Sequence, residues 1–159
     1  VNANLSLSTN KILDYTQFTD LFDSDWNLLG QVQKFYEKSN ISFSPSTVGM
    51  LSFSWFPSQN SYLTLAGKHV GKQFMDNTSD ELTSIPSYYT LSLNMGQSFK
   101  VKGDRFVDLT LFVDNLTNHM YFSNGWTYKA QFEDGSKYME EGIYPQAGIN
   151  FTFKMAIRF

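Results

Sequence analysis

The last sixteen residues, Tyr144 to Phe159, carry the pattern that most constrains what this chain can fold into. From Ile149 onward every odd position is apolar, while the even positions carry polar, charged or small residues. The apolar residues are Ile149, Phe151, Phe153, Met155, Ile157 and Phe159. Side chains on a β-strand point alternately to opposite faces, so this period of two predicts a strand with one apolar and one polar face.

The composition also favours strands and excludes several classes of function. Aromatic residues make up 17% of the 159 residues, and the apolar residues are accompanied by Ser, Thr and Asn rather than by Ala, Glu and Lys. The net charge is −3 with no basic cluster, so we expect no nucleic-acid partner, because phosphate binding needs clustered Lys and Arg. There are no cysteines, which excludes disulfides, thiolate metal ligands and thiol nucleophiles.

Alternating segments recur along the chain and predict an all-β fold, an antiparallel meander of six strands in one domain over residues 1–159. The expected strands cover residues 1–13, 41–56, 62–75, 88–101, 105–123 and 144–159. Long and short connections alternate between them. That alternation is typical of outer-membrane barrels, which have short periplasmic turns and long outer loops.

The connections themselves are expected to be irregular. Residues 14–40 break the period of two and are interpreted as a long loop, with a helical turn capped at Asp23 to Asp25. Residues 76–87 and 124–142 are interpreted as polar connections. Beyond Gly67 the alternation loses phase, which predicts a β-bulge.

Aromatic side chains gather near the expected strand ends, where the edges of a bilayer would lie. They are Trp55, Phe56, Tyr62, Phe99 and Phe106 beside the short turns, and Tyr88, Tyr89, Tyr121, Phe122 and Tyr144 beside the long loops. Amphipathic rings prefer the headgroup region, so the pattern indicates two interface belts. The alternative is that they are core residues at strand ends.

Specific stretches resemble a known family. DNLTNHMYFSNGWTY (Asp114 to Tyr128) and YPQAGINFTFKMAIRF (Tyr144 to Phe159) resemble the C-terminal end of a TonB-dependent outer-membrane receptor of the kind common in Bacteroidetes. ISFSPSTVGMLSFSWFP (Ile41 to Pro57) and LAGKHVGKQFMDNTSD (Leu65 to Asp80) resemble the same family in the same order. The resemblance covers nearly the whole chain.

The resemblance implies the last six strands of a transmembrane β-barrel of about 22 strands with a plugged lumen. Because the chain starts at Val1 with strand-like residues, we expect the plug domain and the segment that binds the energy-coupling protein TonB to lie upstream. The implied function is energy-coupled import of a scarce nutrient, such as a ferric siderophore, haem, cobalamin or a glycan, across the outer membrane of a Gram-negative bacterium. The implied partners are outer-membrane lipid, TonB, the nutrient ligand and the barrel-assembly machinery. That machinery would read an assembly signal formed by Phe151, Phe153, Met155, Ile157 and Phe159.

No catalytic, cofactor or metal motif is found, so we do not expect an enzyme. His69 and His119 are interpreted as ordinary polar positions. The acidic residues Glu133, Asp134, Glu140 and Glu141 are interpreted as a solvated loop face. Two alternatives remain open: a soluble ligand-binding β-barrel or sandwich with its apolar face inside, and a small outer-membrane pore or adhesin without transport.

Overall fold

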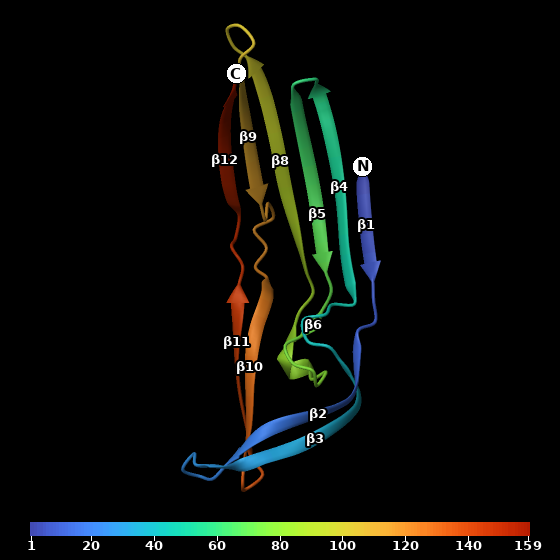
Figure 1. Cartoon of the computed structure of the whole chain (residues 1–159), viewed down its shortest axis with the longest axis vertical. Coiled ribbons are helices and arrows are strands. Elements are labelled where there is room, and N and C mark those ends of the chain that lie inside the picture. Colours follow the sequence, from blue (N-terminus) through green and yellow to red (C-terminus); the bar gives the residue numbers. More distant parts are fainter.

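The alternating segments pair into one large antiparallel sheet. In the computed structural model, which describes all 159 residues, six strands lie side by side in the order β1-β4-β5-β8-β9-β12 (Figure 1). Their bounds are Asn2–Leu7 (β1), Thr47–Ser58 (β4), Ser61–Val70 (β5), Tyr88–Lys100 (β8), Phe106–Asp114 (β9) and Asn150–Arg158 (β12). The predicted all-β, antiparallel class is therefore confirmed. The sheet is open, with β1 and β12 as its two edges.

Two β-hairpins stand where long loops were expected. β2 (Lys11–Phe22) pairs with β3 (Leu28–Asn40), and β10 (Phe122–Phe132) pairs with β11 (Lys137–Pro145). A short parallel pairing between β10 and β2 joins the hairpins into a second sheet, in the order β11-β10-β2-β3. The predictions of irregular structure over residues 14–40 and 124–142 are therefore wrong. The expected strands over residues 105–123 and 144–159 are each shared between the sheet and a hairpin.

The helical turn expected after Asp23 is also wrong, because Asp23 caps a hairpin turn instead. Its Oδ1 accepts hydrogen bonds from the backbone N–H groups of Asp25 (2.9 Å) and Asn27 (2.8 Å). Trp26 at the tip has a positive φ of 62° and packs edge-on against Phe132. The helical spacing that suggested the turn is that of Leu28, Leu29, Val32, Phe35 and Tyr36. These residues lie in β3, where backbone pairing with β2 overrides the local pattern.

The irregularity expected beyond Gly67 lies in a different strand. β5 pairs with β4 on one side and β8 on the other, and neither pairing is interrupted near Gly67. The register shift falls in β4, between Trp55 and Ser58, next to the turn. The chain leaves the sheet after Val70, where the N–H of Gly71 donates to the carbonyl of Thr47 (2.8 Å).

Long and short connections alternate as expected. The short ones run from Ser58 to Ser61 and from Lys100 to Phe106, and the long ones from Leu7 to Thr47, Val70 to Tyr88 and Asp114 to Asn150. Both short turns and the C-terminus lie at one end of the elongated molecule, and both hairpins lie at the other (Figure 1). No helix is long and apolar enough to cross a membrane.

Many of the buried residues lie in the connection between β5 and β8, among them Met75, Thr83 and Ile85. This connection holds β6 (Gln73–Phe74), the 3₁₀ turn η1 (Glu81–Thr83) and β7 (Ser84–Ile85), and β7 contacts β10. Only four apolar side chains are buried in the whole chain: Val70, Met75, Ile85 and Ala130. The segment expected to be a simple polar connection thus forms the small core of the hairpin end.

Two asparagines hold β12 to the turn that follows β9. The side chain of Asn115 is fully buried; its Nδ2 donates to the carbonyls of His119 (2.9 Å) and Ala147 (3.0 Å), and its Oδ1 accepts from the N–H of His119 (2.9 Å). Asn118 Oδ1 accepts from the N–H of Ile149 (3.0 Å). The stretches Asp114 to Tyr128 and Tyr144 to Phe159 are therefore in direct contact.

We expect Asn115→Ala to destabilise the fold by about 2–4 kcal/mol, because the three hydrogen bonds of a fully buried side chain are lost. Asn115 and Asn118 both have a left-handed φ, 49° and 51°, so the backbone cost of Ala is common to the two variants. Asn118→Ala removes one exposed contact and should cost about 1 kcal/mol. Urea unfolding of both variants in detergent micelles measures the difference. Equal losses of unfolding free energy in the two variants would contradict this role of Asn115.

Candidate functional site

The first candidate site is the apolar face of the six-stranded sheet. Cross-strand pairing aligns apolar side chains into continuous rows on this face. One row is Phe53, Leu65, Leu93, Val113 and Phe151; the next is Trp55, Leu63, Met95, Leu111 and Phe153. No other element packs across this face (Figure 1).

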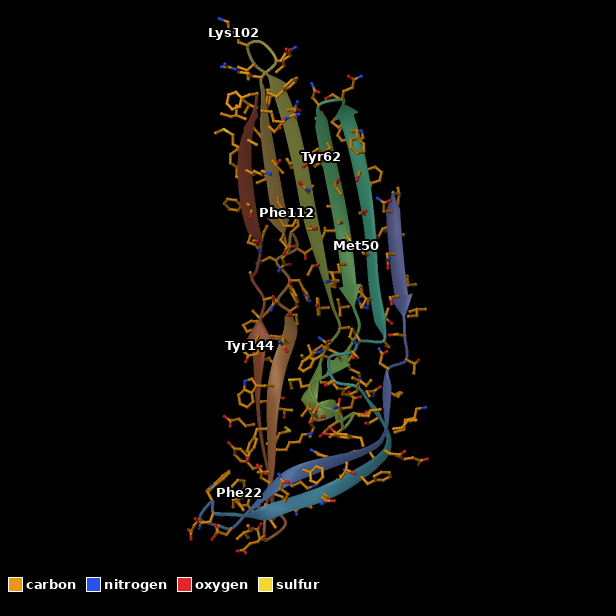
Figure 2. All side chains as sticks on the ribbon, viewed as in Figure 1. Phe22, Met50, Tyr62, Lys102, Phe112 and Tyr144 are labelled. Carbon is orange, nitrogen blue, oxygen red and sulfur yellow. The ribbon has the colours of Figure 1, made fainter.

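The opposite face is polar. The row adjacent to those above is Ser54, Thr64, Asn94, Phe112 and Thr152. Its groups bond to one another: the hydroxyls of Ser54 and Thr64 lie 2.9 Å apart, and the Tyr62 hydroxyl donates to Asn94 Oδ1 (3.2 Å). Figure 2 shows side chains, among them Tyr62 and Phe112, extending from the sheet without a second layer of strands to cover them.

The two uncovered faces give the molecule an unusually large surface. Its accessible area is 10677 Å², whereas a compact monomer of 18.3 kDa would expose about 8,100 Å² by the usual scaling with mass. Phe151, on the apolar face of the edge strand β12, is 76% exposed, and Leu65 in the interior of the sheet is 37% exposed. An apolar surface of this extent marks a site of contact with another apolar phase or partner.

All five residues of the expected assembly signal lie along one side of the final strand. Phe151, Phe153, Met155 and Ile157 are on the apolar face of β12, each paired with an apolar residue of β9. Phe159 follows β12 and is 90% exposed. The guanidinium of Arg105 lies 5.6 Å from the centre of its ring.

The aromatic residues beside the short turns divide between the two faces. Trp55 and Phe99 lie on the apolar face, where a lipid belt would form. Tyr62 and Phe106 lie on the polar face: Tyr62 packs over Gly96, and the guanidinium of Arg158 lies 5.1 Å from the Phe106 ring centre. Phe56 is exposed in the irregular end of β4.

The aromatic residues beside the long connections lie at the junction of sheet and hairpins. Tyr121 stacks on Tyr88, with ring centres 4.6 Å apart, and Tyr89 stacks on His119 at 4.7 Å. Phe122 and Tyr144 lie on the β10–β11 hairpin (Figure 2). The ring stacking ties β8 to the chain after β9, which the spacing of single residues in the sequence does not reveal.

The polar residues singled out in the sequence do not converge. His69 is on β5 opposite Tyr89. Glu133 and Asp134 are in the β10–β11 turn, and Glu140 and Glu141 are on β11. No group of three or more His, Asp or Glu side chains is arranged to hold a metal ion.

A compact ion cluster, not expected from the sequence, joins η1 to β10. Lys129 Nζ lies 2.8 Å from Asp76 Oδ2 and 2.9 Å from Asp80 Oδ2. Asp76 Oδ1 also accepts from the N–H (3.0 Å) and the hydroxyl (2.5 Å) of Thr78. We call Lys129, Asp76 and Asp80 the Lys129 cluster. Lys129 is 49 residues from Asp80 in the chain, so no local sequence motif predicts the cluster.

The contacts within the Lys129 cluster shift the pKa values of all three of its residues. Burial acts to raise the pKa of Asp76, but the hydrogen bonds from Lys129 and Thr78 outweigh it, so the pKa lies below the usual range. The hydrogen bond from Lys129 is the main cause that lowers the pKa of Asp80. Desolvation acts to lower the pKa of Lys129, but the two carboxylates raise it overall.

The second candidate site is a cleft of about 470 Å³ between the two hairpins and η1, which we call the hairpin cleft. β2 and β3 cross the β10–β11 hairpin at its far end, so the two hairpins form an inside corner (Figure 1). The lining includes Gln17, Lys34 and Tyr36 from β2–β3, Lys129, Lys137 and Tyr138 from β10–β11, and Asp80 and Leu82 from the η1 segment. The sequence offered no signal for this cleft, because its walls come from four distant segments.

We expect the stabilisation from the Lys129 cluster to be present at neutral pH and to be lost in acid. Both aspartates have folded pKa values below the unfolded value of about 3.9, so their contribution is complete above that pH and disappears as pH falls through the folded values. Carboxyl ¹³C shifts measured against pH report both midpoints. In Lys129→Met the midpoint of Asp80 should rise towards about 4; an unchanged midpoint would contradict the pairing.

Comparison of the chain with protein-family models, with curated proteins and with solved structures finds no match. The apolar face of the sheet, the hairpin end and the hairpin cleft are therefore the features on which a function can be argued.

Proposed function

We propose that this chain forms six strands in the wall of an outer-membrane β-barrel, with its apolar face towards lipid and its polar face towards an aqueous lumen. The observation that carries the proposal is the pair of uncovered faces, one with continuous apolar rows and one with hydrogen-bonding groups. A lipid-exposed barrel strand alternates in this way, because its outward side chains meet hydrocarbon and its inward ones meet water.

The strand dimensions support the proposal. A tilted strand needs about 9–11 residues to cross a bilayer. β4, β5, β8, β9 and β12 have 12, 10, 13, 9 and 9 residues. β1 is shorter, with 6 residues, and it forms one edge of the sheet.

The two ends of the molecule support an orientation. Outer-membrane barrels have short turns on the periplasmic side and long loops outside. We therefore assign the short turns and Phe159 to the periplasmic side and the two hairpins to the outer surface (Figure 1). The free backbone groups of β1 and β12 would pair with further strands of the barrel wall, since an open edge in lipid leaves hydrogen bonds unsatisfied.

The transport role rests on the resemblance of the stretches around Asn115 and Phe153 to TonB-dependent receptors. In such a receptor this chain would supply barrel wall and outer loops, and TonB would engage a part of the receptor outside these residues. The proposed activity is energy-coupled import of a scarce nutrient, with the ligand held at the hairpin end. A soluble sandwich is less favoured, because a second layer of strands would have to cover the apolar face.

A charge on the apolar face should oppose membrane insertion. Leu65 and Thr64 are neighbours in β5 that point to opposite faces. Leu65→Arg in the complete receptor should weaken its folding into phosphatidylcholine vesicles by about 2–4 kcal/mol, the cost of Arg near the bilayer midplane. Thr64→Arg, the matched control, should cost much less. Urea titration of vesicle-bound protein measures both, and equal losses would rule out a lipid-facing Leu65.

The final aromatic should matter for assembly in cells. Phe159→Ala in the complete receptor should lower its level in the outer membrane, whereas Phe159→Tyr, which retains an aromatic ring, should not. Surface labelling of intact cells compares the variants. Normal surface levels of Phe159→Ala would argue against the assembly signal.

A further inference from the structure

We propose that the hairpin cleft binds a small organic anion, with Lys34 and Lys137 as the residues that attract its charge. The inference deepens the proposed function and rests on it for the position of the cleft on the outer surface. The binding itself depends only on the geometry and charge of the cleft.

The charge of the cleft is opposite to that of the chain. The whole protein carries 15 acidic and 12 basic residues, for a net charge of −3. The cleft lining contains three lysines, Lys34, Lys129 and Lys137, and a single carboxylate, Asp80. Clefts lined by one sign of charge concentrate ligands of the other sign.

Two of these lysines form no close ion pair with a carboxylate, although the charge of Lys34 acts on Asp80 at longer range. Lys129 is held between Asp76 and Asp80, so its charge is already compensated. None of the ion pairs in the structure includes Lys34 or Lys137. The ammonium group of Lys34 lies 4.8 Å from the centre of the Tyr36 ring, which holds it at the cleft wall while leaving its donors free. Both groups are therefore available to a negatively charged ligand.

Neutral donors stand beside the lysines. The Tyr36 hydroxyl donates to Gln17 Oε1 (3.1 Å), which leaves the Gln17 amide NH₂ to donate elsewhere. Gln131, on the same face of the β10–β11 hairpin as Lys129 and Lys137, also lines the cleft. Amide and ammonium donors on several sides suit the oxygens of a carboxylate or phosphate group.

The remaining lining indicates that the ligand has an organic portion. Tyr36 presents a ring surface, and Val32, Leu82 and Met139 present apolar side chains. The cleft volume of about 470 Å³ lies in the range of ordinary small-molecule sites. A bare inorganic ion would leave most of this space and all of this apolar surface unused.

The walls of the cleft are fixed before any ligand arrives. The Lys129 cluster ties η1 to β10, and the parallel pairing of β10 with β2 joins the two hairpins. A site held in place in this way loses little freedom on binding.

The test uses citrate as the probe, with the 159-residue chain in zwitterionic detergent micelles. Backbone amide shifts are followed by NMR during titration with citrate and, separately, with glucose as a neutral compound of similar size. Citrate should shift amides on both hairpins, and glucose should shift them little. No citrate-induced shifts at the cleft, or equal responses to the two compounds, would overturn the proposal.

Substitutions then test whether Lys34 and Lys137 are the residues that attract citrate. Lys34→Gln with Lys137→Gln should weaken citrate binding by about tenfold or more, since two favourable charge interactions are lost. Lys34→Arg with Lys137→Arg should retain it. Lys102→Gln, at the β8–β9 turn far from the hairpins, is the matched control and should bind as the unmodified chain does (Figure 2). An unchanged affinity in the double glutamine variant, with an unchanged thermal unfolding profile, would overturn the assignment.

The result is separable from the proposed membrane role. Leu65→Arg and Thr64→Arg report on the apolar face, and neither residue lines the cleft. Loss of citrate binding with normal vesicle insertion would remove the ligand class and leave the barrel proposal standing. Citrate binding together with equal losses of vesicle folding in Leu65→Arg and Thr64→Arg would remove the barrel proposal and leave the ligand class standing.

Discussion

The register of backbone pairing in the six-stranded sheet is the constraint on which the rest of this structure depends. Each strand alternates apolar and polar residues, and the pairings bring apolar residues opposite apolar residues from β4 to β12. A slip of one residue in any pairing would place a polar row on the apolar face. The sheet therefore has one apolar and one polar face, and its stability depends on the environment in contact with each face.

The two ends of the molecule follow different physical rules. The sheet has no core of its own, and its apolar side chains remain exposed. The hairpin end has buried apolar residues such as Ile85, the buried side chain of Asn115 and the Lys129 cluster, as expected of protein in water. The proposed position in a barrel wall would require this division, because the sheet would meet lipid and the hairpin end would meet water.

The two hairpins give the long connections defined positions for their side chains. An irregular loop would place its side chains loosely, whereas β2–β3 and β10–β11 hold Lys34, Tyr36 and Lys137 at fixed positions on paired strands. Residues on rigid elements form more exact sites than residues on mobile loops. In the proposed function, the asymmetry between short turns and long hairpins places the ligand site at the hairpin end.

The sequence by itself determined the strands of the sheet, their antiparallel order and the common face of Phe151, Phe153, Met155 and Ile157. The strands and the common face follow from local periodicity, because the direction of a side chain on a strand depends only on its position in the alternation. The antiparallel order follows from the series of short and long connections between consecutive strands. Only the tertiary structure decided the hairpins, since the helical spacing in Leu28–Asn40 was overridden by pairing with β2. It also brought Lys129 to Asp76 and Asp80. Such contacts join residues far apart in the chain, and local pattern contains no information about which distant segments meet.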